Sequence, residues 1–166
     1  MILMKNVSIL FLFLAFIASC TKPISPFNEK EVATLLDKWH NAAATANFDE
    51  YFGLMTDNSI FIGTDATEYW TKKQFMNYSK PYFDRGKAWS FKATVRHIYS
   101  SPENPNLAWF DEELDTPNLG PSRGTGVLQK IDGEWKIEQY NLTVPIPNDL
   151  VNGVVKQIEE YSGSNK

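Results

Sequence analysis

The chain has 166 residues, of which 16 are lysine or arginine and 20 are aspartate or glutamate, so its formal net charge is −4. The sequence has no block of basic residues, and a nucleic-acid partner is therefore disfavoured on electrostatic grounds. A single cysteine excludes an internal disulfide, while 5 Trp, 7 Tyr and 11 Phe predict a core or a cavity wall made of aromatic rings.

A bacterial export signal with a lipid-attachment site is predicted at residues 1–19. Lys5 supplies the positive start, an apolar run of ten residues follows, and residues 17–20 have the small-residue pattern of a lipobox. The apolar run is too short for a membrane-spanning helix, which needs about 20 residues. We therefore expect lipid attachment at Cys20, a tether over residues 20–28, and an extracytoplasmic domain anchored to a membrane of the cell envelope. The alternative is an ordinary cleaved signal with a chance cysteine.

Helices are predicted at the start of the following domain, which we place at residues 29–161. Asn28 is a credible N-cap for the first helix, and Glu31 completes a capping-box pair. Apolar residues then recur at helical spacing on one face: Val32, Leu35, Leu36, Trp39 and Ala43. A second, short helix is expected at 48–54.

A strand at residues 59–63 and a loop at 64–70 lead into a third helix. Thr71 and Gln74 repeat the capping-box pattern, and Gly86 suits the C-terminal end of that helix. The first half of the domain is thus expected to be mainly helical.

The period of the apolar residues changes from 3.6 to 2 after Gly86, which predicts a series of antiparallel strands. Asp132-Gly133 is a hairpin signal between the last two strands. One face of each strand is expected to point inward, and these faces carry, in chain order, Trp89, Phe91, Ala93 and Val95; Leu107, Trp109, Asp111 and Glu113; Arg123, Thr125, Val127 and Gln129; and Trp135, Ile137, Gln139 and Asn141.

The C-terminal segment predicts one more helix and a disordered tail. Pro145 and Pro147 end the last strand, Asn148 can cap a helix with an apolar stripe, and residues 162–166 form the tail. Helices followed by consecutive strands predict an α+β fold: a cone-shaped, curved antiparallel sheet packed on the N-terminal helices, plus the C-terminal helix. We expect a pocket inside the cone.

Several short strings along the chain are similar, in this order, to those of a known family. They are Trp39-His40, Phe61 to Glu68, Ala108 to Glu113, Arg123 to Leu128 and Trp135-Lys136-Ile137. Together they resemble the SnoaL-like branch of the nuclear transport factor 2-like (cystatin-like) superfamily over residues 29–147. The resemblance implies the cone fold, but this family contains polyketide cyclases, ketosteroid isomerases, dehydratases and epoxide hydrolases as well as non-catalytic binding and association modules. The activity must therefore be argued from the site. The base and the tyrosine of the ketosteroid isomerases fall near Gly63 and Trp39, which disfavours that chemistry.

The predicted pocket is mostly aromatic, and its predicted ligand is a small apolar or aromatic molecule. The expected walls are Trp39, Phe61, Trp70, Tyr78, Phe83, Trp89 and Trp109, and the expected polar contacts are His40, Asp65, Asp111, Arg123 and Asn141. If Asp111 pairs with Arg123 it stays ionised, whereas an unpaired carboxylate among aromatic rings would have a raised pKa and could transfer protons. Asp65 and Glu68 flank a loop at the pocket mouth, where each could contact a ligand or cap backbone N–H groups.

Two other functions stay open. A cofactor-free isomerase, cyclase or hydrolase would use Asp65 or His40 as catalytic residues for proton transfer, although His40 could equally be a hydrogen-bonded histidine of the wall. A homodimerisation or partner-docking module would use the outer face of the sheet. No cofactor is predicted, and no metal site either, because two histidines far apart in the sequence and no free cysteine do not make a ligand cluster.

Overall fold

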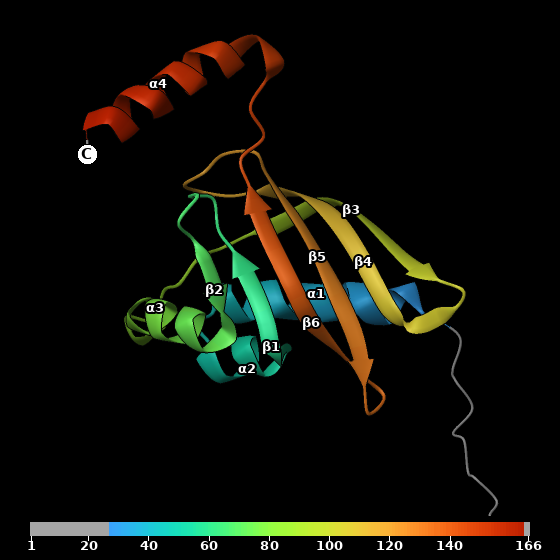
Figure 1. Cartoon of the computed structure of the whole chain (residues 1–166). Helices are drawn as coiled ribbons and strands as arrows, with labels where there is room; N and C mark the ends of the chain where they lie inside the picture. Colours follow the sequence, from blue (N-terminus) through green and yellow to red (C-terminus); the bar gives the residue numbers. More distant parts are fainter. Residues whose placement is uncertain (1–26, 165–166) are drawn as a thin grey trace, which may run out of the picture.

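The computed structural model describes residues 27–164. The predicted signal at 1–19, Cys20 and most of the tether lie outside the described residues. The elements are, in chain order, α1 (Glu29–Ala44), α2 (Phe48–Gly53), β1 (Met55–Ile62), β2 (Tyr69–Thr71), α3 (Lys72–Asp84), β3 (Lys92–Ser101), β4 (Asn104–Asp115), β5 (Ser122–Ile131), β6 (Glu134–Thr143), the 3-10 helix η1 (Asn148–Leu150) and α4 (Val151–Ser164) (Figure 1). β1 begins earlier than expected, and β2 lies partly within the segment expected to be a loop.

The capping residues correctly predicted where two helices begin. Asn28 accepts a hydrogen bond from the Lys30 backbone N–H at 3.1 Å in front of α1. Thr71 and Gln74 form the reciprocal capping box at the start of α3. Gly86 follows α3 with a φ of +75°, a left-handed conformation that favours glycine and ends the helix.

The six strands form one curved sheet in the order β2-β1-β6-β5-β4-β3. Every neighbouring pair is antiparallel except β1 with β6, which is parallel. Helix α1 crosses one face of the sheet, and α2 and α3 lie toward the edge formed by β1 and β2 (Figure 1). Side chains such as Leu36 from α1 and Leu128 and Ile137 from the strands are fully buried between these layers. The α+β cone predicted from the sequence is therefore confirmed.

Irregularities in β3 and β6 decide which side chains point into the cone. The register of β3 shifts between Ala93 and Val95, and Glu138 in β6 has no partner on β5. A β-bulge adds one residue to a strand, bends it, and moves the following side chains to the opposite face. Strict alternation therefore fails beyond each bulge, and Arg96 and Tyr140 turn toward α1 where the sequence pattern predicts outward side chains.

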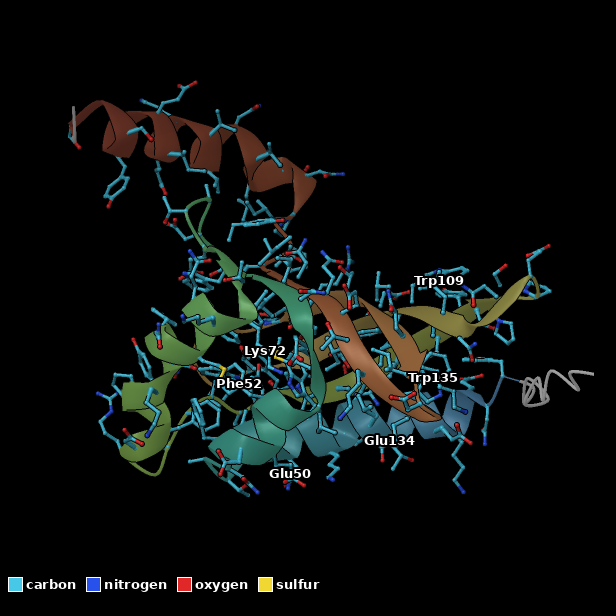
Figure 2. All side chains as sticks on the ribbon, turned by 60° about the horizontal axis from the view of Figure 1, so that its bottom comes forward. Glu50, Phe52, Lys72, Trp109, Glu134 and Trp135 are labelled. Atoms are coloured by element: carbon cyan, nitrogen blue, oxygen red, sulfur yellow. The ribbon has the colours of Figure 1, made fainter. Side chains whose placement is uncertain are left out.

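Helix α4 stands clear of the cone although it carries the apolar stripe predicted for it. None of its residues is buried, and Ile158 and Tyr161 are 58% and 72% exposed. Figures 1 and 2 both show α4 beyond the end of the sheet, attached through the segment that follows β6. The helix ends at Ser164, so residues 162–164 are helical and not part of a disordered tail. Within residues 27–164, no helix has both the length and the apolar character needed to cross a bilayer.

Candidate functional site

Interlocking aromatic rings fill the deep part of the cone. The ring of Trp39 stacks on that of Tyr51 with centroids 4.7 Å apart and meets the ring of Tyr140 at the same distance. The ring of Phe83 packs against Tyr51 at 5.5 Å. All four side chains are buried, so the expectation that Trp39 and Phe83 line the pocket is wrong. Bulky rings from the helices and the sheet pack against one another there, as in the close-packed interiors of other proteins.

A cavity of about 300 Å³ remains at the end of the cone where β1 and β6 finish. Its wall is largely aromatic and includes Phe61, Trp70, Phe75, Tyr78, Trp89 and Phe91. Its polar side chains are Thr64, Glu68, Lys87, Ser90, Thr116 and Asn118. Four of the predicted wall residues thus lie in this lining: Phe61, Trp70, Tyr78 and Trp89. Apolar walls with a few polar groups are typical of small-molecule sites, and the role of these four residues in binding stays a prediction.

The loop between β1 and β2 holds Glu68 at the cavity. The Gly63 N–H donates to the Glu68 carbonyl at 2.8 Å, and the Glu68 N–H donates to the Asp65 carbonyl at 2.9 Å. Glu68 Oε2 accepts a hydrogen bond from the Asp65 N–H at 3.2 Å. A Cβ atom at Gly63 would lie 2.1 Å from that oxygen, so glycine is needed for the carboxylate to lie over the backbone.

Asp65, a predicted catalytic residue, is used within the same loop. Its Oδ1 accepts hydrogen bonds from the Thr67 backbone N–H at 2.8 Å and from the Thr67 hydroxyl at 2.6 Å. These bonds lower the pKa of the Asp65 carboxyl. The side chain is exposed and does not line the cavity. Of the two roles expected for Asp65, the geometry favours the capping of backbone N–H groups, and Glu68 occupies the position next to the cavity.

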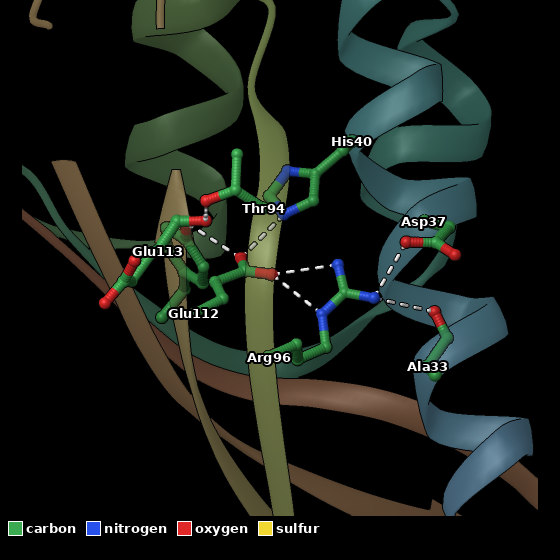
Figure 3. Close-up of polar contacts among 8 residues, drawn as sticks. Ala33, Asp37, His40, Thr94, Arg96, Glu112 and Glu113 are labelled. Carbon is green, nitrogen blue, oxygen red and sulfur yellow. Dashed lines mark hydrogen bonds and ion pairs between the residues drawn. The ribbon is translucent and has the colours of Figure 1, made fainter. Parts of the chain in front are cut away.

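Glu112 is the centre of a buried polar cluster, which the expected strand faces did not include (Figure 3). Its Oε1 lies 2.6 Å from His40 Nε2 and 3.4 Å from the Tyr140 hydroxyl. Its Oε2 accepts a hydrogen bond from Arg96 Nε at 2.9 Å, and Arg96 Nη2 lies 2.8 Å away without hydrogen-bond geometry. Burial alone would raise the pKa of Glu112, but the hydrogen bonds and charges of His40 and Arg96 outweigh it and lower the pKa.

His40 belongs to this cluster and does not line the 300 Å³ cavity. Its ring is buried, and Phe91, which does line the cavity, packs edge-on against it at 6.1 Å. Arg96 Nη1 extends the cluster to α1 by donating to Asp37 at 2.7 Å and to the Ala33 carbonyl at 3.3 Å. The cluster thereby ties α1 to β3 and β4. The geometry favours the hydrogen-bonded role for His40 over that of a general base at the cavity.

Four predicted ligand contacts lie on the outer face of the sheet: Trp109, Asp111, Arg123 and Asn141. Trp109 is 41% exposed and stacks with Tyr99, on the side of β4 away from α1 (Figure 2). Asp111 Oδ1 lies 3.0 Å from His97 Nδ1, so its partner is this histidine and not Arg123. The expectation that these residues line the pocket inside the cone is therefore wrong.

The inner face of β4 offered a signal for the buried cluster. Ala108, Phe110 and Leu114 alternate along the strand and are all buried, and Glu112 is the one charged side chain in that series. A lone acidic residue on an apolar face is rarely buried without a partner, so this pattern predicts a pairing. By contrast, nothing in the sequence marks the loop at 116–119, which also lines the cavity.

The cavity lining combines aromatic rings with two charged side chains. Among the described residues, no three or more His, Cys, Asp or Glu side chains come together in a way that could hold a metal ion. The cavity lining contains the carboxylate of Glu68, the ammonium of Lys87 and several aromatic rings. These groups can stack on a ligand and form one or two charge-assisted hydrogen bonds with it.

Comparison with known proteins supports this fold. The sequence profile of the SnoaL-like domain matches residues 32–147, while no curated protein matches the chain. An NTF2-like protein of unknown function from Pseudomonas putida KT2440 is similar with a TM-score of 0.59 at 12% identity, over 72% of this chain and 88% of that one. An NTF2-like protein from Cytophaga hutchinsonii gives 0.57 at 17% identity, over 72% and 100%. A protein from Xanthomonas campestris, assigned as a calcium/calmodulin dependent protein kinase II association domain, gives 0.54 at 24% identity, over 72% and 88%. These structures show the fold alone. The chain belongs to the SnoaL-like domain family.

Proposed function

We propose that this protein is a lipid-anchored, extracytoplasmic domain that binds a small apolar or aromatic molecule in the cavity at the mouth of its cone. The observation that carries the proposal is the 300 Å³ cavity with its largely aromatic wall. Each Å² of apolar ligand surface removed from water there contributes about 25 cal/mol. The wall is held by the packing of its own rings, such as Phe61 and Phe75 with centroids 3.9 Å apart. Little ordering entropy is therefore lost when a ligand enters.

The position of the cavity suits a domain held by its N-terminus. Phe27, the first described residue, packs edge-on against Trp135 at the start of β6, with centroids 5.9 Å apart. Leu142, seven residues further along β6, lines the cavity. This distance along a strand is about 23 Å. A tether from Cys20 would then reach the end of the sheet opposite to the cavity, which would open away from the membrane.

Two alanines give a matched test of binding. Ala88 lines the cavity, whereas Ala66 is exposed in the loop between β1 and β2 and lies outside the lining. Ala88→Trp should fill the cavity and abolish the rise in Tm that aromatic fragments produce, while Ala66→Trp should retain it. If Ala88→Trp responds to the fragments as the wild type does, the ligand is not bound in this cavity and the proposal fails.

The anchor is tested separately at Cys20. Cys20→Ser should lose a metabolically incorporated fatty-acid label and leave the membrane fraction, because the acyl chains are the only anchor proposed. If the variant keeps the label, the lipid is attached elsewhere and the predicted lipobox is wrong.

Homodimerisation is a second candidate function, favoured by the outer face of β3 and β4. Val95, Tyr99 and Trp109 are each more than 40% exposed, and the rings of Tyr99 and Trp109 stack at 6.0 Å. Contiguous exposed apolar side chains often mark protein contacts. Sedimentation velocity should then show a dimer that Trp109→Glu dissociates and that Gln129→Glu, also exposed on this face, leaves intact. A wild-type monomer at all concentrations would reject this candidate.

The enzymatic alternative has less support. Asp65 is bonded within an exposed loop and His40 within the buried cluster, so these two residues do not form a common site. Neither of them lines the cavity.

A further inference from the structure

We propose that the cavity selects a planar aromatic molecule that carries an ammonium group, with its ring stacked on the wall and its ammonium group bound by Glu68. This inference rests on the proposed function and narrows its ligand to one chemical class. Three features of the cavity support it: the orientation of the rings, the fixed position of Glu68, and the exposure of Lys87, the residue of opposite charge in the lining.

The rings of the wall are close to parallel. Trp70 lies 14° from the plane of Phe75 and 24° from that of Tyr78. Phe75 in turn lies 19° from Phe61 and 25° from Trp89. A flat ligand can align with several of these rings at once, and each such pair adds about 0.5–1.5 kcal/mol beyond the burial of its area. A puckered, saturated ring of the same size can fill the space but cannot align in this way.

The Glu68 carboxylate is held in place before any ligand binds. Its Oε2 is bonded to the Asp65 N–H, and the loop is closed by the backbone bonds from Gly63 to Glu68 and from Glu68 to Asp65. Within residues 27–164, no donor lies in hydrogen-bond geometry with the second oxygen, Oε1. A partly buried, oriented carboxylate with a free oxygen can accept a charge-assisted hydrogen bond without losing further side-chain entropy.

Lys87 is the positively charged residue of the cavity lining, and its ammonium group would favour an anionic ligand. It is exposed in the segment after α3, and a lysine side chain loses up to about 2 kcal/mol of rotamer entropy when it is fixed. The charge of Glu68 also acts on the wall. Hydrogen bonding to Tyr82, burial, and the charges of Tyr82 and Glu68 raise the pKa of Tyr78 to about 12. Glu68 is the last of these causes, so its negative charge reaches the aromatic wall, where it attracts a cation.

Three probes separate the ring preference from the charge preference. 2-Naphthylmethylamine has both proposed features, its decahydro analogue has the ammonium without the flat ring, and 2-naphthylacetate has the ring with the opposite charge. Affinities would be measured by isothermal titration calorimetry on the full-length chain in nanodiscs at neutral pH, with empty nanodiscs as the blank. We expect 2-naphthylmethylamine to bind about tenfold more tightly than either of the other two.

Two variants assign the charge preference to its residue. Glu68→Gln should remove the preference for the amine over the acetate while retaining the preference for the flat ring, because glutamine can still accept the bond from the Asp65 N–H. Lys87→Gln is the control and should retain or increase the preference for the amine.

The outcomes distinguish this inference from the proposed function. Equal binding of the decahydro analogue, equal or tighter binding of the acetate, or an unchanged charge preference in Glu68→Gln overturns the inference, while the cavity remains a binding site. If neither these probes nor any apolar or aromatic fragment binds in a way that Ala88→Trp abolishes, the proposed function is overturned as well.

Discussion

Replacing Glu112 with alanine should lower the free energy of unfolding by about 3 kcal/mol. The side chains of Arg96 and His40 are 11% and 6% exposed, and the substitution removes the carboxylate that both of them contact. Breaking a buried ion pair costs about 3–5 kcal/mol because the remaining charge has no partner. Arg96 still contacts Asp37 at 2.7 Å, which places the expected cost at the lower end of that range.

Thermal and urea unfolding followed by circular dichroism measure this cost. For a domain of this size, 3 kcal/mol corresponds to a fall of about 10 °C in Tm. Glu113→Ala is the matched control, since Glu113 is the next residue on β4 and is exposed; it should change the free energy of unfolding by less than about 0.5 kcal/mol. Glu112→Gln should lie between the two, because its amide oxygen can still accept a bond from Arg96. If the Glu112 and Glu113 variants unfold alike, the reasoning is refuted.

The pH dependence of stability gives a second measurement of the same cluster. The pKa of Glu112 in the folded protein is below its ordinary value of 4.5, so the unfolded chain takes up the proton first as the pH falls. The contribution of this carboxylate to the free energy of unfolding is therefore complete above pH 4.5. It is lost as the pH falls through the lower pKa that Glu112 has in the folded protein. The difference in stability between the wild type and Glu112→Gln should shrink as the pH falls below about 4.5. A difference that persists undiminished until acid unfolding would contradict this assignment.

Other predictions concern close packing, α4 and the cavity wall. Gly124→Ala should lower the free energy of unfolding in urea by about 1–3 kcal/mol, because its Cβ would lie 2.3 Å from the Tyr140 hydroxyl. Gly153→Ala in α4 is the control and should not lower it, since its Cβ meets nothing within 4 Å. Equal stabilities of the two variants would disprove the close approach. Truncation after Pro147 removes α4, which has no buried residue, and should change Tm by less than about 2 °C; a larger fall would mean that α4 packs on the cone. Titration followed by tyrosine absorbance should show a group with a pKa of about 12 that is absent in Tyr78→Phe; an unchanged curve would count against the hydrogen bond, burial and charges that raise this pKa.

The helix starts could be predicted from the sequence because capping is a local interaction. Asn28 contacts the N–H of a residue two positions away, and Thr71 and Gln74 contact each other across three. The hairpin at Asp132-Gly133 is equally local, and both residues have a positive φ. Order of elements and fold class follow from such short-range patterns, which is why they agree with the structure.

The inner faces of β3 and β6 could not be predicted in the same way. A bulge such as that at Glu138 is required by the curvature of the whole sheet, and alternation of residue types does not reveal it. After this residue, Tyr140 is buried, and Asn141 is paired with Thr125 on the outer row. One extra residue therefore turns Tyr140 toward α1 and Asn141 toward the outer face, which is why the predicted ligand contact at Asn141 does not line the pocket.

Two glycines lie directly beside the two carboxylates, Glu68 and Glu112, that the predicted strand faces did not include. A Cβ at Gly63 would lie 2.1 Å from Glu68 Oε2, and a Cβ at Gly124 would lie 3.0 Å from Glu112 Oε1. Both glycines occur within strings that carry the family resemblance, yet the sequence does not say which side chain takes the space that a missing Cβ leaves. Glu68 comes from five residues further along the same loop, whereas Glu112 comes from the neighbouring strand. The first neighbour is set by the closure of a loop and the second by the register of a sheet. Glu68 lines the cavity because the loop closes, whereas Glu112 joins the buried cluster because of the register of the sheet. The sequence does not distinguish these two carboxylates, and only the assembled fold shows that Glu68 can contact a ligand while Glu112 holds α1 in place.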